Sequence, residues 1–566
     1  MPDWTKEQKK AIDSRHGSIL VSAAAGSGKT AVLVQRVIER LKDEDNPCPA
    51  DELLIVTFTR AATAQMKERI YQALMSEIDK APDSDLLKRQ ALLLPFAKIS
   101  TIDSFCNDIV RENFHDIDIS PDYGILDNSQ LALMCDDAVS RVMDELYKEN
   151  SPEFTELVGI MANGTDDSAL TDLICKLYND SMAFARPEEF LYGLSCVYHN
   201  DIPLEDHLWG NIIIDYAAQS IEYCLMLCEK MYDAGIADPI VGEKYSVGIA
   251  NNTAMFEELA KIIEHGSWDE IRNAISSASV GSLGRLPNKY SSAQSESVKA
   301  QKKVLSDQLK KLTALFCASE SENKDDMNYL EPIAEKLIDA VVRYGEILNE
   351  EKKAANSYDF SDICHFALKL LVSYDKDGKA HKTPLAESFA ERFEEILVDE
   401  YQDVNDLQNT LFWAVSKNET NMFTVGDVKQ SIYRFRQAMP EIFLQKRKAL
   451  ENFEGDNYPA KITLDRNFRS RSGVTENVNF LFSQIMSSYL GSVNYNKNEQ
   501  LVAAADYEES NFPEAEMYIL GDMEEKVGRE SEAQFIADKI HEIISGGMKV
   551  KDKNGYRKAS YRDFCI

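Results

Sequence analysis

The stretch Ile19-Leu-Val-Ser-Ala-Ala-Ala-Gly-Ser-Gly-Lys-Thr30 decides the fold of this chain. Its apolar start is typical of a buried strand, and the residues after Thr30 have the periodicity of a helix. The loop between them fits a P-loop, with Ala23 at the first small position and Gly28 and Lys29 near its end. Backbone N–H groups and the helix N-terminus would bind phosphate there. An ordinary strand-to-helix turn is the alternative, but Lys-Thr at the helix start favours a nucleoside triphosphate site.

The composition of the 566 residues narrows the class of protein further. No apolar run reaches the roughly 20 residues needed to span a bilayer, and the N-terminal residues lack the apolar core of a signal peptide. The ten cysteines are scattered without a Cys-x-x-Cys pair, which favours reduced thiols and a cytoplasmic protein. A net charge of −33 argues against a protein that coats polyanions, although a groove needs only local positive charge to bind nucleic acid.

The order of predicted elements indicates an α/β fold with a large helical insertion. Short apolar runs at 53–58 and 98–101 are each followed by a helical pattern, as in a doubly wound parallel sheet. Long helical periodicities then dominate, and the strand rhythm returns at 395–400 and 421–427. We therefore expect one nucleotide-binding domain over 1–460, with its core at 1–115 and 351–460 and an all-helical insertion at 116–350. A second domain is expected over 461–566. Residues 561–566 resemble the start of another strand, so the chain is expected to be truncated.

Val398-Asp399-Glu400 supplies the acids that triphosphate hydrolysis requires. Such hydrolysis needs a carboxylate at the end of a buried strand to hold Mg²⁺ and a base to activate water. Asp399 is the expected metal ligand, together with the Thr30 hydroxyl, and Glu400 is the expected base. Adjacent acids are often only a solvated pair, but these follow an apolar strand.

The chain resembles superfamily 1 helicases of the UvrD/Rep type through motifs that occur in the family's order. The string Leu397-Val-Asp-Glu-Tyr-Gln-Asp403 resembles their Walker B motif, and Leu464-Asp-Arg-Asn-Phe-Arg-Ser470 resembles motif IV. The other matching strings are Thr5-x-x-Gln8, Thr57-Phe-Thr-Arg-Ala-Ala62, Ser100-Thr-Ile-Asp-Ser-Phe-Cys106 and Val425-Gly-Asp-Val-Lys-Gln-Ser-Ile-Tyr-Arg-Phe-Arg-Gln-Ala438, the last resembling motif III.

A finer resemblance is to AddA-type ATP-dependent helicase/nuclease subunits of the AddAB complex. Val428-Lys429 stands where stand-alone UvrD/Rep proteins commonly have two acids, and Tyr358-Asp-Phe-Ser-Asp362 and Glu532-Ala-Gln-Phe-Ile-Ala537 also match. The resemblance is strong at 1–115 and 355–475 and carries little signature in the inserted helices. It implies a P-loop RecA-like domain and the start of a second RecA-like domain after 460.

The resemblance assigns roles around ATP and Mg²⁺. Gln8 would read the adenine and Phe468 would stack on it. Gln430 would sense the γ-phosphate, Arg469 would act as an arginine finger, and Lys29 and Glu400 would be catalytic. The remaining ATP contacts would come from the loop itself: Ala23, Ala24, Ala25, Gly26, Ser27, Gly28 and Thr30.

The resemblance also implies a single-stranded DNA site. Aromatic faces with nearby cations are the usual means of holding single strands. A core aromatic with solvated arginines is the alternative for the segment around Tyr433. The implied DNA contacts are Phe58, Thr59, Ser104, Phe105, Tyr433, Phe435 and Arg436.

The implied function is an ATP-dependent 3′-to-5′ DNA helicase motor that processes double-strand breaks for recombinational repair. Its implied partners are an AddB-type nuclease protein, single-stranded DNA and double-stranded DNA ends. Motifs V and VI and a nuclease motif are absent from these 566 residues. If the chain were complete, unwinding would be doubtful and nuclease activity excluded. A stand-alone UvrD/Rep-type helicase and an ATP-switched protein that binds single-stranded DNA remain as alternatives.

Overall fold

The computed structural model describes residues 4–162, 164, 166–432, 437–509, 512–521, 525–552 and 555–566. These residues form two compact units. The first comprises the described residues up to Asp127, Met182–Ala185 and Asn356–Ile566, and the second comprises Asn128–Ser181 and Arg186–Ala355. The helical insertion was expected at 116–350, whereas the second unit begins at Asn128 and ends at Ala355.

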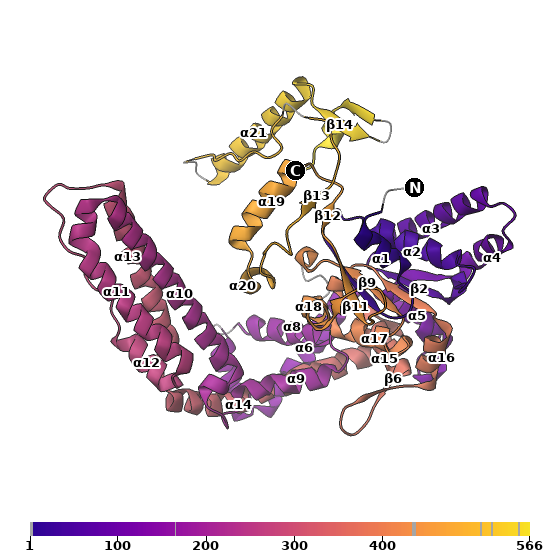
Figure 1. Cartoon of the computed structure of the whole chain (residues 1–566). Helices are drawn as coiled ribbons and strands as arrows, with labels where there is room; N and C mark the ends of the chain where they lie inside the picture. Colours follow the sequence, from indigo (N-terminus) through magenta and orange to yellow (C-terminus); the bar gives the residue numbers. More distant parts are fainter. Residues whose placement is uncertain are drawn as a thin grey trace. The chain divides into compact units, whose positions relative to one another are not determined.

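The first unit is built on a seven-stranded sheet of order β10-β11-β1-β9-β8-β2-β3. Figure 1 labels β2, β9 and β11 of this sheet. Every neighbouring pair in it is parallel. This confirms the expected parallel sheet and places the strands near 20, 56, 99, 398 and 424 beside one another. The strands are β1 (Ile19–Ala23), β2 (Leu53–Thr57), β3 (Lys98–Thr101), β8 (Glu395–Val398), β9 (Met422–Gly426), β10 (Glu451–Asn452) and β11 (Ala460–Leu464).

Helices cover both faces of this sheet, which explains why its strands read as continuous apolar runs. Every residue of β1, β2 and β9 is buried. Val21 and its alternate neighbours pack on one face, while Leu20 packs on the other. On the Val21 face lie α1 (Lys6–Asp13), α2 (Lys29–Leu41), α3 (Arg60–Lys80) and α4 (Asp85–Leu93); on the Leu20 face lie α5 (Ile102–Glu112), α15 (Phe360–Leu371), α16 (Pro384–Arg392), α17 (Asp406–Val415) and α18 (Pro440–Ala449).

The position of β11 corrects the expected domain boundary. The second domain was expected to begin at residue 461, but β11 extends past that position and pairs with β1 over Ala460–Leu464. Among the described residues after Leu464, strands pair only two at a time, so a second RecA-like domain stays a prediction. Tyr561–Asp563 forms a 3₁₀ turn where a strand was expected. The later elements are β12 (Arg466–Asn467), α19 (Ser472–Ile485), α20 (Ser488–Gly491), β13 (Val502–Ala503), α21 (Glu525–Ser545), β14 (Lys549–Asp552) and β15 (Gly555–Lys558).

Two short ribbons complete the first unit. One is parallel and joins the segments on either side of the second unit, while the other is an antiparallel hairpin. Their strands are β4 (Gly124–Ile125) with β5 (Ser357–Tyr358), and β6 (Val372–Tyr374) with β7 (Ala380–Lys382).

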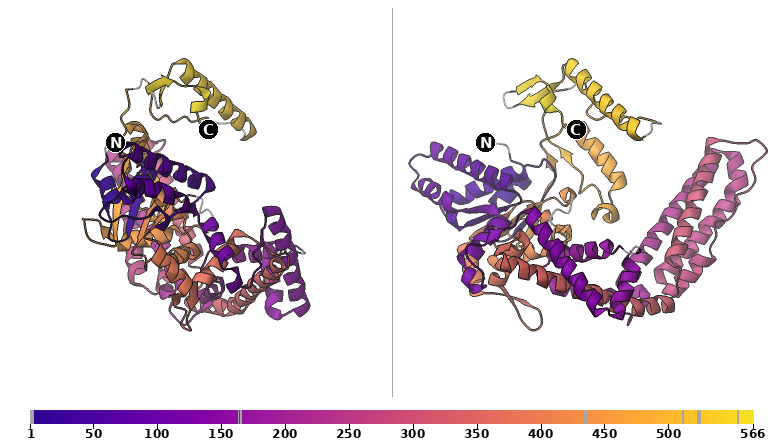
Figure 2. Two further views of the ribbon diagram at one scale, coloured as in Figure 1. Left: turned by 90° about the vertical axis from the view of Figure 1, so that its right-hand side faces the viewer. Right: turned by 180° about the vertical axis from the view of Figure 1, so that it is seen from behind.

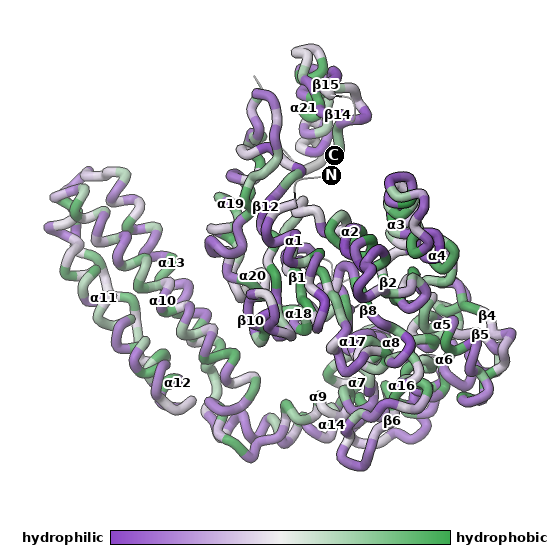
Figure 3. Tube along the Cα trace, turned by 45° about the vertical axis from the view of Figure 1, so that its right-hand side comes forward, coloured by the Kyte–Doolittle hydropathy of each residue, from purple (hydrophilic) through white to green (hydrophobic). Residues whose placement is uncertain are grey.

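The second unit is helical in the residues that the structure describes. One group of its helices encloses an apolar core around Trp268 and Phe316. Figure 2 shows the long helices of this group, drawn in magenta, alongside one another. These helices alternate hydrophobic and hydrophilic residues along their length, as amphipathic helices do (Figure 3). The unit consists of α6 (Asn128–Glu149), α7 (Pro152–Met161), α8 (Ser168–Ser181), α9 (Pro187–Ser195), α10 (Leu208–Ala237), α11 (Pro239–His265), α12 (Trp268–Ser277), α13 (Ala293–Leu315) and α14 (Glu320–Ala354).

The helical periodicity at 254–275 falls on two separate helices. Its first part ends at His265, and a new helix begins at Trp268. Ser267 caps this second helix in a reciprocal arrangement with Glu270, and a Cβ at Gly266 would lie 2.6 Å from the carbonyl oxygen of Ile262. The capping box was therefore the sequence signal for the break. No helix in the described ranges has the length and apolar character needed to cross a membrane.

Candidate nucleotide-binding site

The loop between β1 and α2 has the backbone of an anion cradle. Gly26 and Gly28 have φ values of 73° and 81°, which residues with a Cβ rarely adopt. Gly28 is the N-cap of α2 and offers no side-chain cap, so the first N–H groups of the helix remain available to a ligand. Ser27 is buried, and its hydroxyl has no hydrogen-bond partner among the described residues.

Three strands bring their motifs to Lys29, the first residue of α2. Its ammonium group lies 2.9 Å from Oε2 of Glu400, which follows β8. The same group donates to Oε1 of Gln430 at 3.3 Å, in the 3₁₀ turn after β9. Because β9 lies between β1 and β8 in the sheet, the carboxyl ends of all three strands meet at one edge. The sequence-predicted catalytic residues Lys29, Glu400 and Gln430 are therefore brought together.

Asp399 and Glu400 occupy distinct environments although they are adjacent. Burial raises the pKa of Asp399 to about 6, and the neighbouring charge of Glu400 adds to this, while Lys29 opposes it. Glu400 has a φ of 54°, an uncommon conformation for a residue with a side chain. The Glu400 N–H donates to Oδ1 of Asp399 at 3.1 Å. The turn thus directs one carboxylate towards Lys29 and leaves the other in a desolvated position.

A buried amide, which the sequence analysis did not single out, joins these carboxylates to motif III. Gln402 donates from Nε2 to Oε2 of Glu400 at 2.9 Å. Its Oε1 accepts the backbone N–H of Asp427 at 2.9 Å. Asp427 in turn accepts a 2.9 Å hydrogen bond on Oδ2 from the amide of Gln430. Gln402 and Asp427 stand inside the quoted motif strings, which was the available signal for them.

Gln8 lies against the P-loop. Its Nε2 donates to the carbonyl oxygen of Ser27 at 3.0 Å. Its Oε1 accepts the N–H of Thr5 at 2.9 Å, completing a capping box at the start of α1. Both ends of the amide are therefore occupied in this state, and adenine reading by Gln8 stays a prediction.

Motif IV packs directly on the P-loop through Asn467, a buried residue that the sequence analysis did not assign. Asn467 donates from Nδ2 to the carbonyl oxygen of Ala25 at 2.9 Å, and the N–H of Phe468 donates to the carbonyl oxygen of Gly26 at 2.9 Å. Oδ1 of Asn467 accepts the N–H of Arg469 at 2.9 Å. The Phe468 and Arg469 side chains are exposed beside this loop, and their ATP contacts remain predictions.

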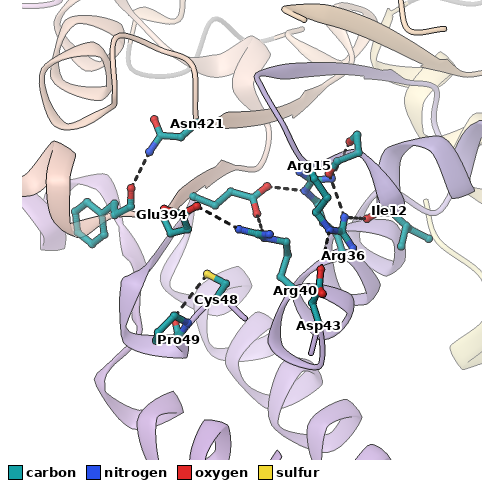
Figure 4. Close-up of polar contacts among 12 residues, drawn as sticks. Ile12, Arg15, Arg36, Arg40, Asp43, Cys48, Pro49, Glu394 and Asn421 are labelled. Carbon is teal, nitrogen blue, oxygen red and sulfur yellow. Dashed lines mark hydrogen bonds and ion pairs between the residues drawn. The ribbon is translucent and has the colours of Figure 1, made fainter. Parts of the chain in front are cut away.

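A buried ion cluster joins α2 to β8 at the ends opposite the site (Figure 4). Arg36 Nε lies 2.6 Å from Oε1 of Glu395, and Arg40 Nε lies 3.1 Å from Oε2 of the same carboxylate. All three side chains are at least nine-tenths buried. Because α2 begins at Lys29 and β8 ends just before Asp399, the cluster fixes the two elements that carry the site relative to each other.

The residues expected to bind DNA fall into three groups. Thr59 and Ser104 lie at the starts of α3 and α5, where Thr59 caps its helix and Ser104 contacts Thr101 Oγ1 at 2.9 Å. Phe58 is partly buried beside Thr59. Tyr433, Phe435 and Arg436 lie outside the described residues.

Phe105 requires a correction. It is 3% exposed and packs in the core against the rings of Phe389 and Phe393, with centroids 6.1 Å away in each case. The ring therefore cannot stack on a base from this position, because the apolar face of α5 is turned towards the sheet. The pattern Ile102, Phe105, Cys106, Ile109, Val110 is the helical core spacing that could have indicated this.

A cleft with several cations opens beside Thr101 and Ser104. Arg60, Lys67 and Arg392 line it, together with Lys98, whose ammonium group pairs with Asp108 at 3.4 Å. The cleft therefore carries local positive charge although the whole chain has a net charge of −33.

Comparison with known proteins identifies the family. Residues 4–451 match the family model described as the UvrD/REP helicase N-terminal domain. Several proteins named as subunits of an ATP-dependent helicase/nuclease are similar to this chain. The one from Clostridium acetobutylicum is 33% identical, over 100% of this chain and 48% of that protein. The one from Ruminiclostridium cellulolyticum is 36% identical, over 89% and 41%. The one from Clostridioides difficile is 36% identical, over 89% and 40%.

The chain spans about half the length of the curated relatives it matches. The match to the helicase domain model covers most of the chain and includes the P-loop, the Asp399–Glu400 pair and motif III. This chain therefore belongs to the UvrD/REP helicase N-terminal domain family.

Proposed function

We propose that this chain is the ATP-dependent motor of a 3′-to-5′ DNA helicase, within a helicase/nuclease subunit that processes double-strand DNA breaks for recombinational repair. The observation that carries the proposal is the convergence of Lys29, Glu400 and Gln430 from three strands onto one sheet edge. Family membership and the names of the similar proteins support the helicase and nuclease-subunit parts.

The residues at this edge fit Mg²⁺ and a triphosphate. The left-handed glycines, the uncapped start of α2 and the Ser27 hydroxyl, which has no partner in the part of the chain that the structure describes, suit phosphate oxygens. Asp399 and Thr30 would hold Mg²⁺, which would neutralise charge on the phosphates during their transfer. In the cradle, Ala23, Ala24 and Ala25 have small side chains, which would let a phosphate approach the loop closely.

Lys29 and Glu400 exchange partners in the proposed cycle. Without phosphate, the Lys29 charge is compensated by Glu400 at 2.9 Å. Triphosphate binding would compete for this ammonium group and release Glu400 to accept a proton from the attacking water. Gln402 holds the released carboxylate through its 2.9 Å hydrogen bond. Arg469, exposed beside the P-loop, would stabilise the charge that develops on the γ-phosphate.

Single-stranded DNA would bind in the cleft beside α3 and α5. Thr59 and Ser104 supply hydroxyls at two helix starts, and Arg60, Lys67 and Arg392 supply positive charge for phosphates. Phe58 would provide an aromatic face at the same edge of the sheet.

The proposal includes a protein partner and a cellular location. The similar proteins are named as subunits, which supports assembly with a second protein. We propose that this second protein is an AddB-type nuclease and that the complex acts in the cytoplasm, where reduced thiols are expected for the ten scattered cysteines.

The test measures ATP hydrolysis by the full-length protein with and without single-stranded DNA, and unwinding of duplexes with a 3′ or a 5′ tail. We expect DNA-stimulated hydrolysis and unwinding from the 3′ tail only. Nucleotide-dependent DNA binding without unwinding would instead favour an ATP-switched binding protein. Unwinding by a full-length protein that lacks nuclease activity, both alone and with its AddB-type partner, would favour a stand-alone helicase.

A further inference from the structure

Lys429 is a largely enclosed cation, 14% exposed, held between the nearby carboxylate of Asp427 and one from a distant part of the sequence. Its Nζ lies 2.9 Å from Oδ1 of Asp427 and 3.1 Å from Oε2 of Glu499. Burial disfavours the charge on Lys429, but Asp427 and Glu499 outweigh this effect and raise its pKa. The contact to Glu499 joins motif III to a residue 70 positions further along the chain.

Glu499 belongs to the segment that positions motif IV. It is 7% exposed and lies shortly before β13. Val502 and Ala503 of β13 pair with Arg466 and Asn467 of β12. β12 leads directly into Phe468 and Arg469, and Asn467 is the residue that binds the P-loop carbonyl of Ala25.

The carboxylate of Asp427 connects this pair to the nucleotide site. Oδ2 of Asp427 accepts a hydrogen bond from Nε2 of Gln430. Oε1 of Gln430 in turn accepts a hydrogen bond from the ammonium group of Lys29. Oδ1 of Asp427 contacts Lys429. A shift of Gln430, caused by a triphosphate that binds Lys29, would therefore change the hydrogen bonding of the Asp427 carboxylate. Asp427 and Glu499 share the ammonium group of Lys429. Buried charges transmit such changes strongly, because leaving one unpaired is costly.

We propose that Glu499 is a positioning residue that couples the nucleotide-sensing turn around Gln430 to the segment carrying Arg469, through its ion pair with Lys429. This inference rests on the proposed function. It holds that the ion pair between Lys429 and Glu499 transmits the change at the ATP site to motif IV. Glu499 also pairs with Arg447 of α18, which anchors the same segment without contacting Asp427 among the interactions described. Removing Lys429 therefore tests whether Glu499 couples the two sites, whereas removing Arg447 tests whether Glu499 only anchors its own segment.

The experiment measures the affinity of the full-length protein for fluorescent single-stranded DNA without nucleotide and with a non-hydrolysable ATP analogue and Mg²⁺. The ratio of the two dissociation constants is the nucleotide coupling, which is typically about 5–150-fold in allosteric proteins. We expect Glu499→Gln to bring this ratio to within about twofold of 1. Lys429→Gln should do the same from the motif III side, which keeps the test valid if Glu499→Gln does not fold.

Three comparisons decide the outcome. Combining Lys429→Gln with Glu499→Gln should lower the ratio no further than either alone, because both remove one contact. Arg447→Gln should keep the wild-type ratio, as should Glu476→Gln, which removes an exposed carboxylate from α19. Any one of three results would overturn the inference. These are a wild-type ratio in Glu499→Gln, additive losses of the ratio in the double variant, and an equal loss of the ratio in Arg447→Gln. A wild-type protein without nucleotide coupling or DNA-stimulated hydrolysis would instead overturn the proposed function.

Discussion

Lys29 and Glu400 form an ion pair with 2.9 Å between Nζ and Oε2, although 371 positions separate them in the sequence. Lys29 begins α2, the helix that follows β1, and Glu400 follows β8. These two strands lie on either side of β9. The lysine that would bind phosphate and the carboxylate that would activate water are thus each other's partners before nucleotide arrives. Competition for Lys29 then links phosphate binding to release of the base.

Replacing Lys29 tests this link. Lys29→Ala should lower ATP hydrolysis by roughly 10²-fold or more, since a positive charge aimed at the phosphates is lost. The fold should persist, because the Lys29 side chain reaches across the loop rather than into the core. Phosphate release and the melting temperature of the full-length protein measure the two effects. Lys42→Ala, at the far end of α2, is the matched control; hydrolysis that survives in Lys29→Ala would show the P-loop assignment to be wrong.

Substitutions of the two adjacent acids, Asp399 and Glu400, should impair different steps of ATP hydrolysis. Glu400→Gln should retain Mg·ATP binding and lose turnover, because an amide cannot take a proton from water. Asp399→Asn should instead weaken the dependence on Mg²⁺, because a charged oxygen ligand is removed. Binding of a fluorescent ATP analogue across a Mg²⁺ titration separates these outcomes. An equal loss of nucleotide affinity in both variants would contradict the division of roles.

The raised pKa of Asp399 predicts a pH-dependent cost to stability. Because its pKa is about 6 in the folded state against an ordinary 3.8, ionisation opposes folding. The cost is full above pH 6 and disappears as the pH falls towards 4. Asp399→Asn should therefore stabilise the metal-free protein at pH 7.5 by up to about 3 kcal/mol and by less at pH 5. Melting temperatures in a chelator measure this; a gain that grows towards low pH would contradict it.

The buried cluster below the site should matter more to stability than its exposed neighbour. Glu395→Gln leaves the buried guanidinium groups of Arg36 and Arg40 without their carboxylate, at an expected cost of about 3–5 kcal/mol. Glu394→Gln removes an exposed partner of Arg40 and should cost roughly 1 kcal/mol or less. Denaturant unfolding of the two variants makes the comparison, and similar midpoints would show that the buried cluster carries no special weight.

Phe105 distinguishes a core aromatic from a DNA contact. Phe105→Ala should destabilise the protein by about 3–5 kcal/mol, because the ring fills the space between Phe389 and Phe393. Phe105→Leu keeps most of the apolar volume and should retain wild-type affinity for single-stranded DNA. The measurements are urea unfolding for the first variant and DNA titration for the second. Loss of DNA affinity in a well-folded Phe105→Leu would restore the stacking role.

The parallel sheet was predictable from the sequence because each of its central strands is a short, mostly apolar run followed by a motif. Parallel strands are buried on both faces, so they leave this pattern without help from distant residues. The P-loop was predictable for a similar reason, since Gly26, Gly28 and Lys29 act through local backbone conformation and spacing. The break between the helices before Trp268 was also predictable from neighbouring residues, because Ser267 and Glu270 form a capping box.

Other features depended on contacts that no local pattern encodes. The sequence did not indicate that β11 closes onto β1, because its apolar run suits any buried strand of a parallel sheet. The motif-like position of Phe105 suggested exposure, whereas the helical spacing of its neighbours turned it into the core. The pairing of Lys429 with Glu499 joins residues 70 positions apart, and only the folded chain selects that carboxylate among many.

The sequence by itself therefore determined the elements, their order and the chemistry that each strand end presents. The tertiary structure alone decided which side chains meet: Lys29 with Glu400, Asn467 with the P-loop, and Lys429 with Glu499. The physical reason is one of range. Backbone conformation and burial periodicity are set by neighbours within a few residues, whereas ion pairs and buried amides are set by the packing of elements far apart in the chain.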